Sequence, residues 1–425
     1  MREIIEQAFR APSEPPASRE RLFVQVGIVL ASTLLLLGRQ TGRSPLDSLW
    51  AEDGAVFLAR AVEGSSLLAV IEPYQGYIHF APRMLASIAS WFPLQAAPLV
   101  LSGGAALTVA LLGVFIYRVS ASYIAADWLR LVLALSPALV PVGSAEAYNN
   151  AANLHWYLMY AAFWALLWAP ERFGDRLVAS VIVLVAALSD PLTAMLAPLV
   201  VLRMVLRPRR DHLVTLAFAA GLAVQGAVIL TADHEREFPV SASPLDIGIW
   251  YATRVLTASV FGERLAVLDG SIGSYAVLVL TAAIVAGLVV LAWRLSPDHR
   301  VKLVWLAVGS SVLLYVAPTM LTGLATPRYA VAPALLLAVG IVGLLDAGLE
   351  RTHRQGPLAT IGAVWIVLWL ISYPAVNERS TGPSWTVEVA EARAHCAGEE
   401  PSATVTIPIS PNDWDFVAAC RDVVP

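Results

Sequence analysis

The sequence predicts an all-α membrane protein: a polytopic bundle of about eleven transmembrane helices. The chain has 425 residues, of which 58% are hydrophobic and only 14% charged, whereas soluble domains carry roughly 25% charged residues. Apolar runs recur along almost its whole length, and most approach the ~20 residues with which a helix crosses ~30 Å of hydrocarbon. This composition excludes an ordinary soluble domain, and no basic tract indicates nucleic-acid binding.

Apolar segments can be placed in order along the chain. They are residues 22–38, 96–117, 124–142, 155–169, 177–188, 192–206, 213–231, 273–293, 303–322, 329–348 and 357–375. The first follows Arg10, Arg19 and Arg21 and is not followed by an Ala-x-Ala cleavage site, so we expect a retained anchor and not a signal peptide. The predicted organisation is an N-terminal tail at 1–21, a transmembrane bundle over 22–375 with outer loops at 39–95, 143–154 and 232–272, and a small C-terminal tail at 376–425.

The basic residues predict the orientation. With the N-terminus in the cytoplasm, the short inner connections hold more than half of the 28 basic residues, although the outer segments are much longer. This assignment depends on residues 177–206, which we interpret as a hairpin broken at Ser189-Asp190-Pro191. One long helix would instead reverse every later segment and place Arg207–Arg210 outside. A twelve-residue helix rises only ~18 Å, so the hairpin predicts a turn at membrane depth beside a polar cavity that opens outward.

Both cysteines, Cys396 and Cys420, lie in the C-terminal tail. Confining cysteines to one tail is typical of an oxidising compartment, and a bond between these two would be worth about 3 kcal/mol through loop closure. We therefore expect a disulfide and an extracytoplasmic tail. The alternative is two unrelated free thiols.

Polar groups gather in the predicted outer connections. The mid-membrane parts of the helices contain almost no ionisable side chain, with Gln225 as the main polar exception, whereas ion-coupled transporters usually need carboxylates or histidines at that depth. On the outer side every connection carries candidate binding groups. In chain order they are Glu52, Asp53, Tyr77, His79, Arg83, Asn149, Asn150, Asn153, His155, Asp190, His234, Glu235, Arg236, Arg254 and Arg328.

The stretch Leu49-Trp50-Ala51-Glu52-Asp53-Gly54 directly follows the first predicted span. In this respect the chain resembles the GT-C superfamily of integral-membrane glycosyltransferases, in which a catalytic aspartate lies in the first outer loop and juxtamembrane helices follow. The resemblance covers roughly residues 20–375, through topology and this acidic motif, and implies outer juxtamembrane helices at 55–72. The chain departs from the best-known members because it lacks a large soluble outer domain, which leaves the acceptor open.

The resemblance implies an inverting transfer of a hexose or pentose from a polyprenyl-phosphate donor to a hydroxyl of a glycan, lipid or protein, at the outer face of the cytoplasmic membrane. A carboxylate must accept the hydroxyl proton, and a cation must stabilise the charge on the departing phosphate. Asp53 is the candidate base and Glu52 the second candidate; Asp53 could instead cap a helix beginning near Gly54. No cofactor is expected, although Glu52 and Asp53 could bind one divalent cation.

The remaining candidates each have a structural alternative. Arg83, Arg328 and, less directly, Arg254 could bind phosphate bidentately, or could carry their charge to the lipid headgroups. His79 and His155 could orient acceptor hydroxyls or be ordinary hydrogen-bonded residues. The other candidates are Asp190, as a ligand or a helix cap; Asn149, Asn150 and Asn153, as sugar ligands or caps, with Asn149 and Asn153 on one helical face; and Tyr77, as a ligand or part of an interfacial aromatic belt with Trp50, Tyr74 and Trp91.

Two other functions fit the same topology. A transporter or flippase of a lipid-linked glycan would move substrate without forming glycosidic bonds. A non-catalytic membrane assembly protein would tolerate charge-neutral changes in its outer loops. A glycan polymerase or ligase is a close chemical neighbour of the transferase.

Overall fold

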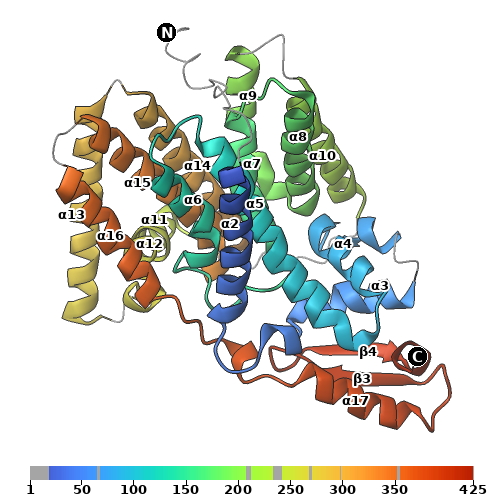
Figure 1. The fold of residues 1–425 in the computed structure, drawn as a ribbon. Helices are drawn as coiled ribbons and strands as arrows, with labels where there is room; N and C mark the ends of the chain where they lie inside the picture. The colour runs from blue at the N-terminus through green and yellow to red at the C-terminus, as the bar shows by residue number, and fades with distance from the viewer. Residues whose placement is uncertain are drawn as a thin grey trace.

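The computed structural model describes residues 19–64, 68–206, 212–232, 242–267, 270–296, 298–351 and 355–424. These residues form a bundle of helices with a small α/β module at one end (Figure 1). Most of the predicted tail at 1–21, the basic cluster at 207–210 and the candidates His234, Glu235 and Arg236 lie outside the described residues.

Six helices in the described part of the chain are long and apolar enough to cross a membrane, which indicates a multi-pass membrane protein. The apolar spans are Leu22–Arg39, Leu94–Ser120, His212–Thr231, Ile272–Leu295, His299–Thr322 and Pro327–Arg351. They correspond to α2 (Arg19–Arg39), η5 (Leu94–Ala96) with η6 (Leu99–Gly103) and α5 (Gly104–Ser120), α10 (His212–Thr231), α13 (Ile272–Leu295), α14 (His299–Thr322), and η10 (Pro327–Ala330) with α15 (Val331–Arg351).

The expected number of about eleven spans is therefore corrected to six. The other predicted segments do form helices, but short ones: α6 (Asp127–Leu139), α7 (Leu154–Leu167), α8 (Phe173–Ser189), η7 (Pro191–Leu196) with α9 (Ala197–Leu206), and α16 (Gln355–Ile371). The longest of these have 17 residues and rise only ~26 Å, less than the thickness of the hydrocarbon core. The break expected at 189–191 is present, because Asp190 is extended (φ −157°, ψ 127°) between α8 and η7.

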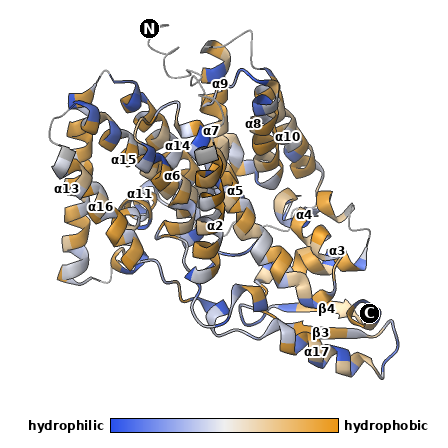
Figure 2. Ribbon diagram, viewed as in Figure 1, coloured by the Kyte–Doolittle hydropathy of each residue, from blue (hydrophilic) through white to orange (hydrophobic). Residues whose placement is uncertain are grey.

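Two helices form the centre of the bundle. All 14 residues of α7 are buried, as is 94% of the apolar window of α15. Most residues of α7 are apolar, as expected for a helix that is buried on every side. By contrast, only 11% of the α13 window is buried, and Figure 2 shows this largely hydrophobic helix at the outside of the bundle. Such an exterior suits contact with lipid chains.

Short elements follow α2 in the first predicted outer segment. They are η2 (Pro45–Asp47), η3 (Asp53–Leu58), α3 (Ala59–Glu63), η4 (Leu68–Ile71), β1 (Pro73–Tyr74), β2 (Tyr77–Ile78) and α4 (Phe80–Ala89). β1 and β2 form an antiparallel hairpin in which Pro73 pairs with Ile78. Its two turn residues, Gln75 (φ 54°) and Gly76 (φ 83°), are both left-handed, which matches the twist of a tight hairpin. Gln225 of α10 anchors this hairpin through hydrogen bonds with both backbone groups of Ile78.

A second set of short elements lies between α10 and α13, in the predicted outer loop 232–272. They are α11 (Pro244–Trp250), η8 (Tyr251–Thr257), α12 (Ala258–Phe261) and η9 (Glu263–Leu265). The Glu263 carboxylate accepts hydrogen bonds from the backbone N–H groups of Gly143 and Ser144. This contact joins the loop to the segment before α7.

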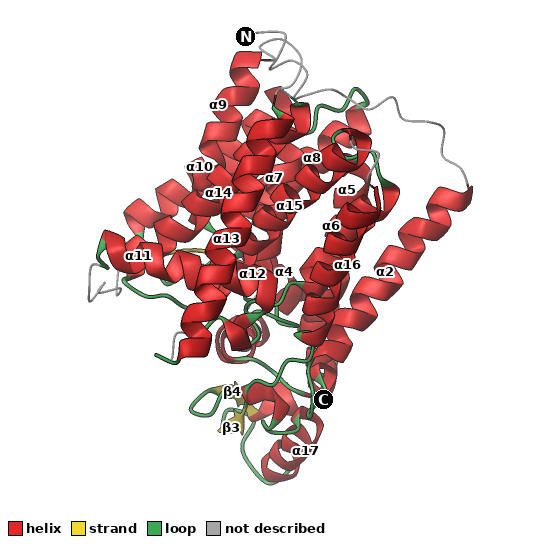
Figure 3. Cartoon of the chain, turned by 90° about the vertical axis from the view of Figure 1, so that its left-hand side faces the viewer, coloured by secondary structure: helices red, strands yellow, loops and turns green. Residues whose placement is uncertain are grey.

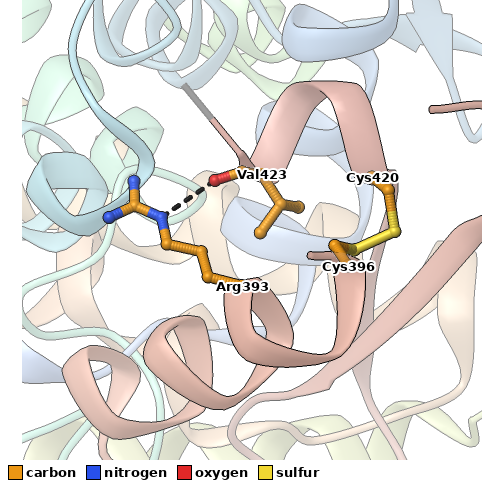
Figure 4. The surroundings of a disulfide bond; sticks show 4 residues. All are labelled: Arg393, Cys396, Cys420 and Val423. Atoms are coloured by element: carbon orange, nitrogen blue, oxygen red, sulfur yellow. Dashed lines mark hydrogen bonds between the residues drawn. A yellow bond between two sulfur atoms is a disulfide. The ribbon is translucent and has the colours of Figure 1, made fainter. Parts of the chain in front are cut away.

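The C-terminal tail is a folded module, where the sequence predicted only a small tail. It contains η11 (Glu378–Ser380), α17 (Trp385–Cys396), β3 (Thr404–Pro408), β4 (Asp415–Ala419) and α18 (Cys420–Val423), and β3 and β4 pair antiparallel. Figures 1 and 3 both show this module beside the Arg39 end of α2, away from the end at which α2 begins. The predicted disulfide between Cys396 and Cys420 is present, and Arg393 donates a hydrogen bond to the Val423 carbonyl beside it (2.9 Å; Figure 4).

Removing this disulfide is expected to destabilise the module by about 3 kcal/mol, because the bond closes a loop between residues 24 apart in the chain. In the Cys396→Ser/Cys420→Ser variant, hydrogen–deuterium exchange over 385–424 should therefore accelerate. A reductant should reproduce the change in the wild-type protein and add nothing in the variant. Equal exchange in all four samples would contradict a stabilising role.

The module is attached to the first outer segment by backbone hydrogen bonds. Ser410 N–H donates to the Leu49 carbonyl (3.1 Å), and Ala51 N–H donates to the Ser410 carbonyl (2.5 Å). The Trp385 indole N–H donates to the Leu94 carbonyl (2.9 Å). The module therefore rests on the segments before and after α4.

Arg379 secures the same junction from inside. Its side chain is 1% exposed, and burial lowers its pKa to about 10. The guanidinium donates to backbone or hydroxyl oxygens in three separate segments, namely those of Pro45, Ser48, Ser102, Tyr148 and Asn149. A single buried arginine thus holds the module, the first outer segment and the segment before α7 together.

Candidate functional site

A cavity of about 630 Å³ lies where these outer segments meet. It is lined from several elements by polar and aromatic groups, and on one side by apolar residues of η7, α10 and α14. The polar and aromatic lining includes Glu52, Tyr74, Gln75, Tyr77, His79, Asn153, His155, Trp156, Asp190, Arg328, Tyr329 and Trp414. The cavity thus brings together Glu52, Tyr77, His79, Asn153, His155, Asp190 and Arg328 from the sequence candidates. Asp53, Arg83, Asn150 and Arg254 do not line it.

Asp53 lies beneath the cavity wall. Its side chain is 1% exposed, and its two carboxylate oxygens accept hydrogen bonds from the N–H groups of Ala151 and Ala152, each at 2.8 Å. It does not cap a helix, because the helical turns already begin at Ala51. Asp53 therefore ties the first outer segment to the turn before α7.

Burial raises the pKa of Asp53 to about 7, although the two N–H groups and the nearby Arg379 oppose this shift. The folded protein therefore binds a proton that the unfolded chain releases near pH 4. This contribution to stability is fully present below pH ~4 and is lost as the pH rises through ~7, with a slope of about 1.4 kcal/mol per pH unit inside that window.

The thermal unfolding temperature in detergent is expected to fall between pH 5 and pH 7 for this reason. In Asp53→Asn the fall should be smaller, because the amide does not titrate. The variant should also be less stable at every pH, since an amide offers one oxygen to two N–H groups. The same pH slope in both proteins would contradict the raised pKa.

Glu52 occupies a different position from its neighbour. It is half-buried, lines the cavity, and makes no hydrogen bond or ion pair with the described part of the chain. It directly precedes the π-helical segment η3, and π-helical turns are frequent at functional sites. Of the two adjacent acidic residues, Glu52 is therefore the one available to a ligand.

Arg328 provides the cation of the cavity. Its Nη1 lies 2.7 Å from Oε2 of Glu146, which holds the guanidinium at the cavity wall. Burial raises the pKa of Glu146, opposed by the charge of Arg328. A guanidinium has five N–H donors, so Arg328 can bind a further anion while it remains paired with Glu146.

His155 and Asp190 lie beside each other on the same cavity. Nδ1 of His155 lies 2.8 Å from the Ala152 carbonyl, which can only accept, so Nδ1 carries a proton. Nε2 then faces Oδ2 of Asp190 at 3.4 Å. Asp190 also caps η7, because its Oδ1 accepts from the N–H of Leu192 (2.7 Å). Asp190 therefore caps η7 and also lines the cavity.

The β1–β2 hairpin supplies an aromatic wall. The rings of Tyr77 and His79 are stacked with centroids 4.0 Å apart, and those of Phe57 and Tyr74 meet edge to face at 5.9 Å. His79 Nδ1 lies 3.2 Å from the Tyr77 carbonyl. The hairpin thus presents a preformed surface to the cavity.

The asparagines before α7 build the local chain path. We expected Asn149 and Asn153 to share a helical face, but this is wrong, because Asn149 is left-handed (φ 54°) and not helical. Oδ1 of Asn150 accepts hydrogen bonds from the backbone and side chain of Asn153, and Oδ1 of Asn153 accepts from the Trp156 indole (3.2 Å). Of these residues Asn153 lines the cavity.

Two arginine candidates lie elsewhere. Arg83 is 2% exposed and donates to the carbonyls of Ala69 (3.0 Å) and Pro73 (3.4 Å), which fixes η4 and the hairpin on α4. Arg254 is exposed and lines a separate cavity of about 360 Å³ with residues of α11, η8 and η9.

Sequence reasoning did not single out Glu146 or Trp414 for this site. Glu146 precedes α7 and pairs with the cavity residue Arg328, and Trp414, which lines the cavity, lies in the C-terminal module. The alternation of Thr404–Pro408 was a possible strand signal, but no local pattern places Trp414 at a cavity formed by the first outer segment.

No group of three or more His, Cys, Asp or Glu side chains suited to a metal ion occurs within the described residues. A scan against models of known protein families finds no match for this chain, and a search of curated proteins finds none either.

Proposed function

We propose that this protein is a membrane glycosyltransferase that moves a sugar from a polyprenyl-phosphate donor to an acceptor hydroxyl. The observation that carries the proposal is the composition of the 630 Å³ cavity. It combines an available carboxylate at Glu52, a guanidinium at Arg328 and an apolar side. These are the three groups that such a transfer requires.

The apolar side supports a lipid-linked donor. It includes Met195 of η7, Ile229 of α10 and Leu321 of α14. The Leu321 side chain is 57% exposed, so an exposed apolar surface of the candidate span α14 borders the cavity. A polyprenyl chain can lie against that surface while its phosphate reaches Arg328.

The proposed step is a single displacement. The acceptor oxygen forms a bond to the anomeric carbon as the bond from that carbon to the phosphate oxygen breaks, and the electron pair leaves with the phosphate. Glu52 accepts the hydroxyl proton, and Arg328 stabilises the charge on the polyprenyl phosphate. Asp53 positions Glu52 through its bonds to the turn before α7.

We further propose that the cavity faces the exterior of a cytoplasmic membrane and that the N-terminus is cytoplasmic, which requires that an odd number of the shorter apolar helices also cross the membrane. The Cys396–Cys420 disulfide supports this orientation, because disulfides persist in oxidising compartments. The arginine-rich connections at the other ends of the helices agree with it. This arrangement, with an acidic residue in the first outer segment, is also what the resemblance to the GT-C superfamily implies.

The test uses the purified chain in lipid nanodiscs with radiolabelled polyprenyl-phosphate hexoses and pentoses and a mixture of glycan, lipid and peptide acceptors. The expected result is consumption of one donor and a product with a new glycosidic bond. Movement of a labelled lipid-linked sugar across vesicles without a new bond would identify a flippase instead. If neither sugar transfer nor movement of the lipid-linked sugar is detected, a non-catalytic assembly role remains.

A further inference from the structure

Trp414 reaches the cavity from a part of the chain remote from the other lining residues. It lies in the turn between β3 and β4 and is half-buried. Its N–H donates to the Pro411 carbonyl (3.2 Å), and its carbonyl accepts from the Ile409 N–H (3.0 Å). Both backbone groups are thus engaged inside the turn, which fixes the position from which the indole projects.

Trp414 and Glu52 enter the cavity from adjoining segments. Ser410, four residues before Trp414, exchanges backbone hydrogen bonds with Leu49 and Ala51. Glu52 follows directly after Ala51. The attachment of the module therefore sets the indole near the available carboxylate.

The indole of Trp414 also differs from the other aromatic groups of the cavity. Tyr77 stacks on His79, Tyr74 meets Phe57, and Trp156 meets Tyr329 with ring centroids 5.7 Å apart. Within the described residues Trp414 makes no such ring contact and no side-chain hydrogen bond. Its side chain packs in part on the hydrophobic core and otherwise lines the cavity, where it can contact a ligand.

An aromatic face beside a carboxylate matches the chemistry of a sugar ring. One face of a pyranose or furanose presents C–H groups, which pack on an indole, while its rim presents hydroxyl groups, which donate hydrogen bonds to a carboxylate. An acyl chain would use only the indole, and a peptide would require an edge or groove for its backbone. The pair therefore selects a carbohydrate.

We propose that Trp414 and Glu52 form the acceptor subsite and that the acceptor is itself a glycan. This inference rests on the transferase function proposed above and adds the acceptor class. The terminal sugar of the acceptor stacks on Trp414 and directs one hydroxyl to Glu52, which takes its proton. The C-terminal module then determines acceptor choice, and the helical bundle binds the donor.

The experiment compares Trp414→Ala, Trp414→Phe and Trp91→Ala in nanodiscs, with the donor found above and a series of hexose and pentose disaccharides as acceptors. Trp91 is 64% exposed and does not line the cavity, so it is the matched control. In Trp414→Ala the KM for the disaccharide should rise about tenfold, with a smaller change in kcat and in the KM for the donor. Trp414→Phe should restore most of the affinity, and Trp91→Ala should match the wild type.

Binding without turnover provides the second readout. Saturation-transfer NMR with the same disaccharides should show contact of the sugar C–H groups with the wild-type protein and a weaker signal in Trp414→Ala. If the wild type transfers sugar but the Trp414→Ala acceptor KM is unchanged, the acceptor inference fails and the transferase function stands. If the wild type consumes no donor, both proposals are overturned.

Discussion

Replacing Glu52 by glutamine is expected to lower the rate of sugar transfer by about 10²–10⁴-fold, the usual contribution of a positioned general base. Glutamine keeps the size of the side chain and its hydrogen-bonding capacity but cannot accept the acceptor proton. Because Glu52 makes no hydrogen bond or ion pair with the described residues, its replacement should leave thermal unfolding almost unchanged. The measurement is kcat with the donor and acceptor at saturation.

Two further variants test whether the loss of activity is specific to Glu52 or follows from removing any carboxylate of the first outer segment. Glu63→Gln removes an exposed carboxylate that pairs with Arg60 and does not line the cavity, so its activity should equal that of the wild type. Asp53→Asn should lose activity together with stability. A near wild-type kcat in Glu52→Gln would show that Glu52 is not the general base.

Replacing Arg379 by methionine is expected to lower the free energy of unfolding by about 3–5 kcal/mol, as for other buried charged groups with several partners. Methionine fills a similar volume but leaves the oxygens of Pro45, Ser48, Ser102 and Asn149 without their donor. The C-terminal module should loosen from the bundle. Thermal unfolding and hydrogen–deuterium exchange in detergent measure the two effects.

Arg421→Met is the matched control within the same module. The Arg421 side chain is 63% exposed and lies 3.8 Å from the Asp422 carboxylate. Exposed ion pairs contribute little to stability, so the free energy of unfolding should change by no more than ~0.5 kcal/mol. Equal unfolding temperatures for the Arg379 and Arg421 variants would contradict the importance of the buried network.

The features that the sequence predicted correctly are local ones. Apolar runs predicted helices throughout, the Ser189-Asp190-Pro191 break was recognisable from a cap followed by proline, and two cysteines in one tail predicted their disulfide. Helix length was predicted less well, and the expected number of spans was too large. The ends of α7 depend on the asparagine network before it and on its burial at the bundle centre, which are tertiary properties.

Within the site, the sequence predicted the types of residue but not the direction in which each side chain points. Glu52 and Asp53 are adjacent, and successive residues of a helix point about 100° apart, so their two carboxylates face different surroundings. The choice is made by the turn at Ala151 and Ala152, which offers two N–H groups to Asp53. Arg83 resembled a phosphate ligand but serves the fold, because its partners lie in η4 and the hairpin.

The backbone link from Leu49 and Ala51 to Ser410 has a consequence for biogenesis. A ribosome makes the first outer segment early and the β3–β4 turn among the last residues of the chain described here. Until that turn is made, the nascent protein lacks the Trp414 edge of its cavity. Under the proposed function, an incompletely synthesised copy would hold the Arg328 side of the cavity without its proposed acceptor subsite.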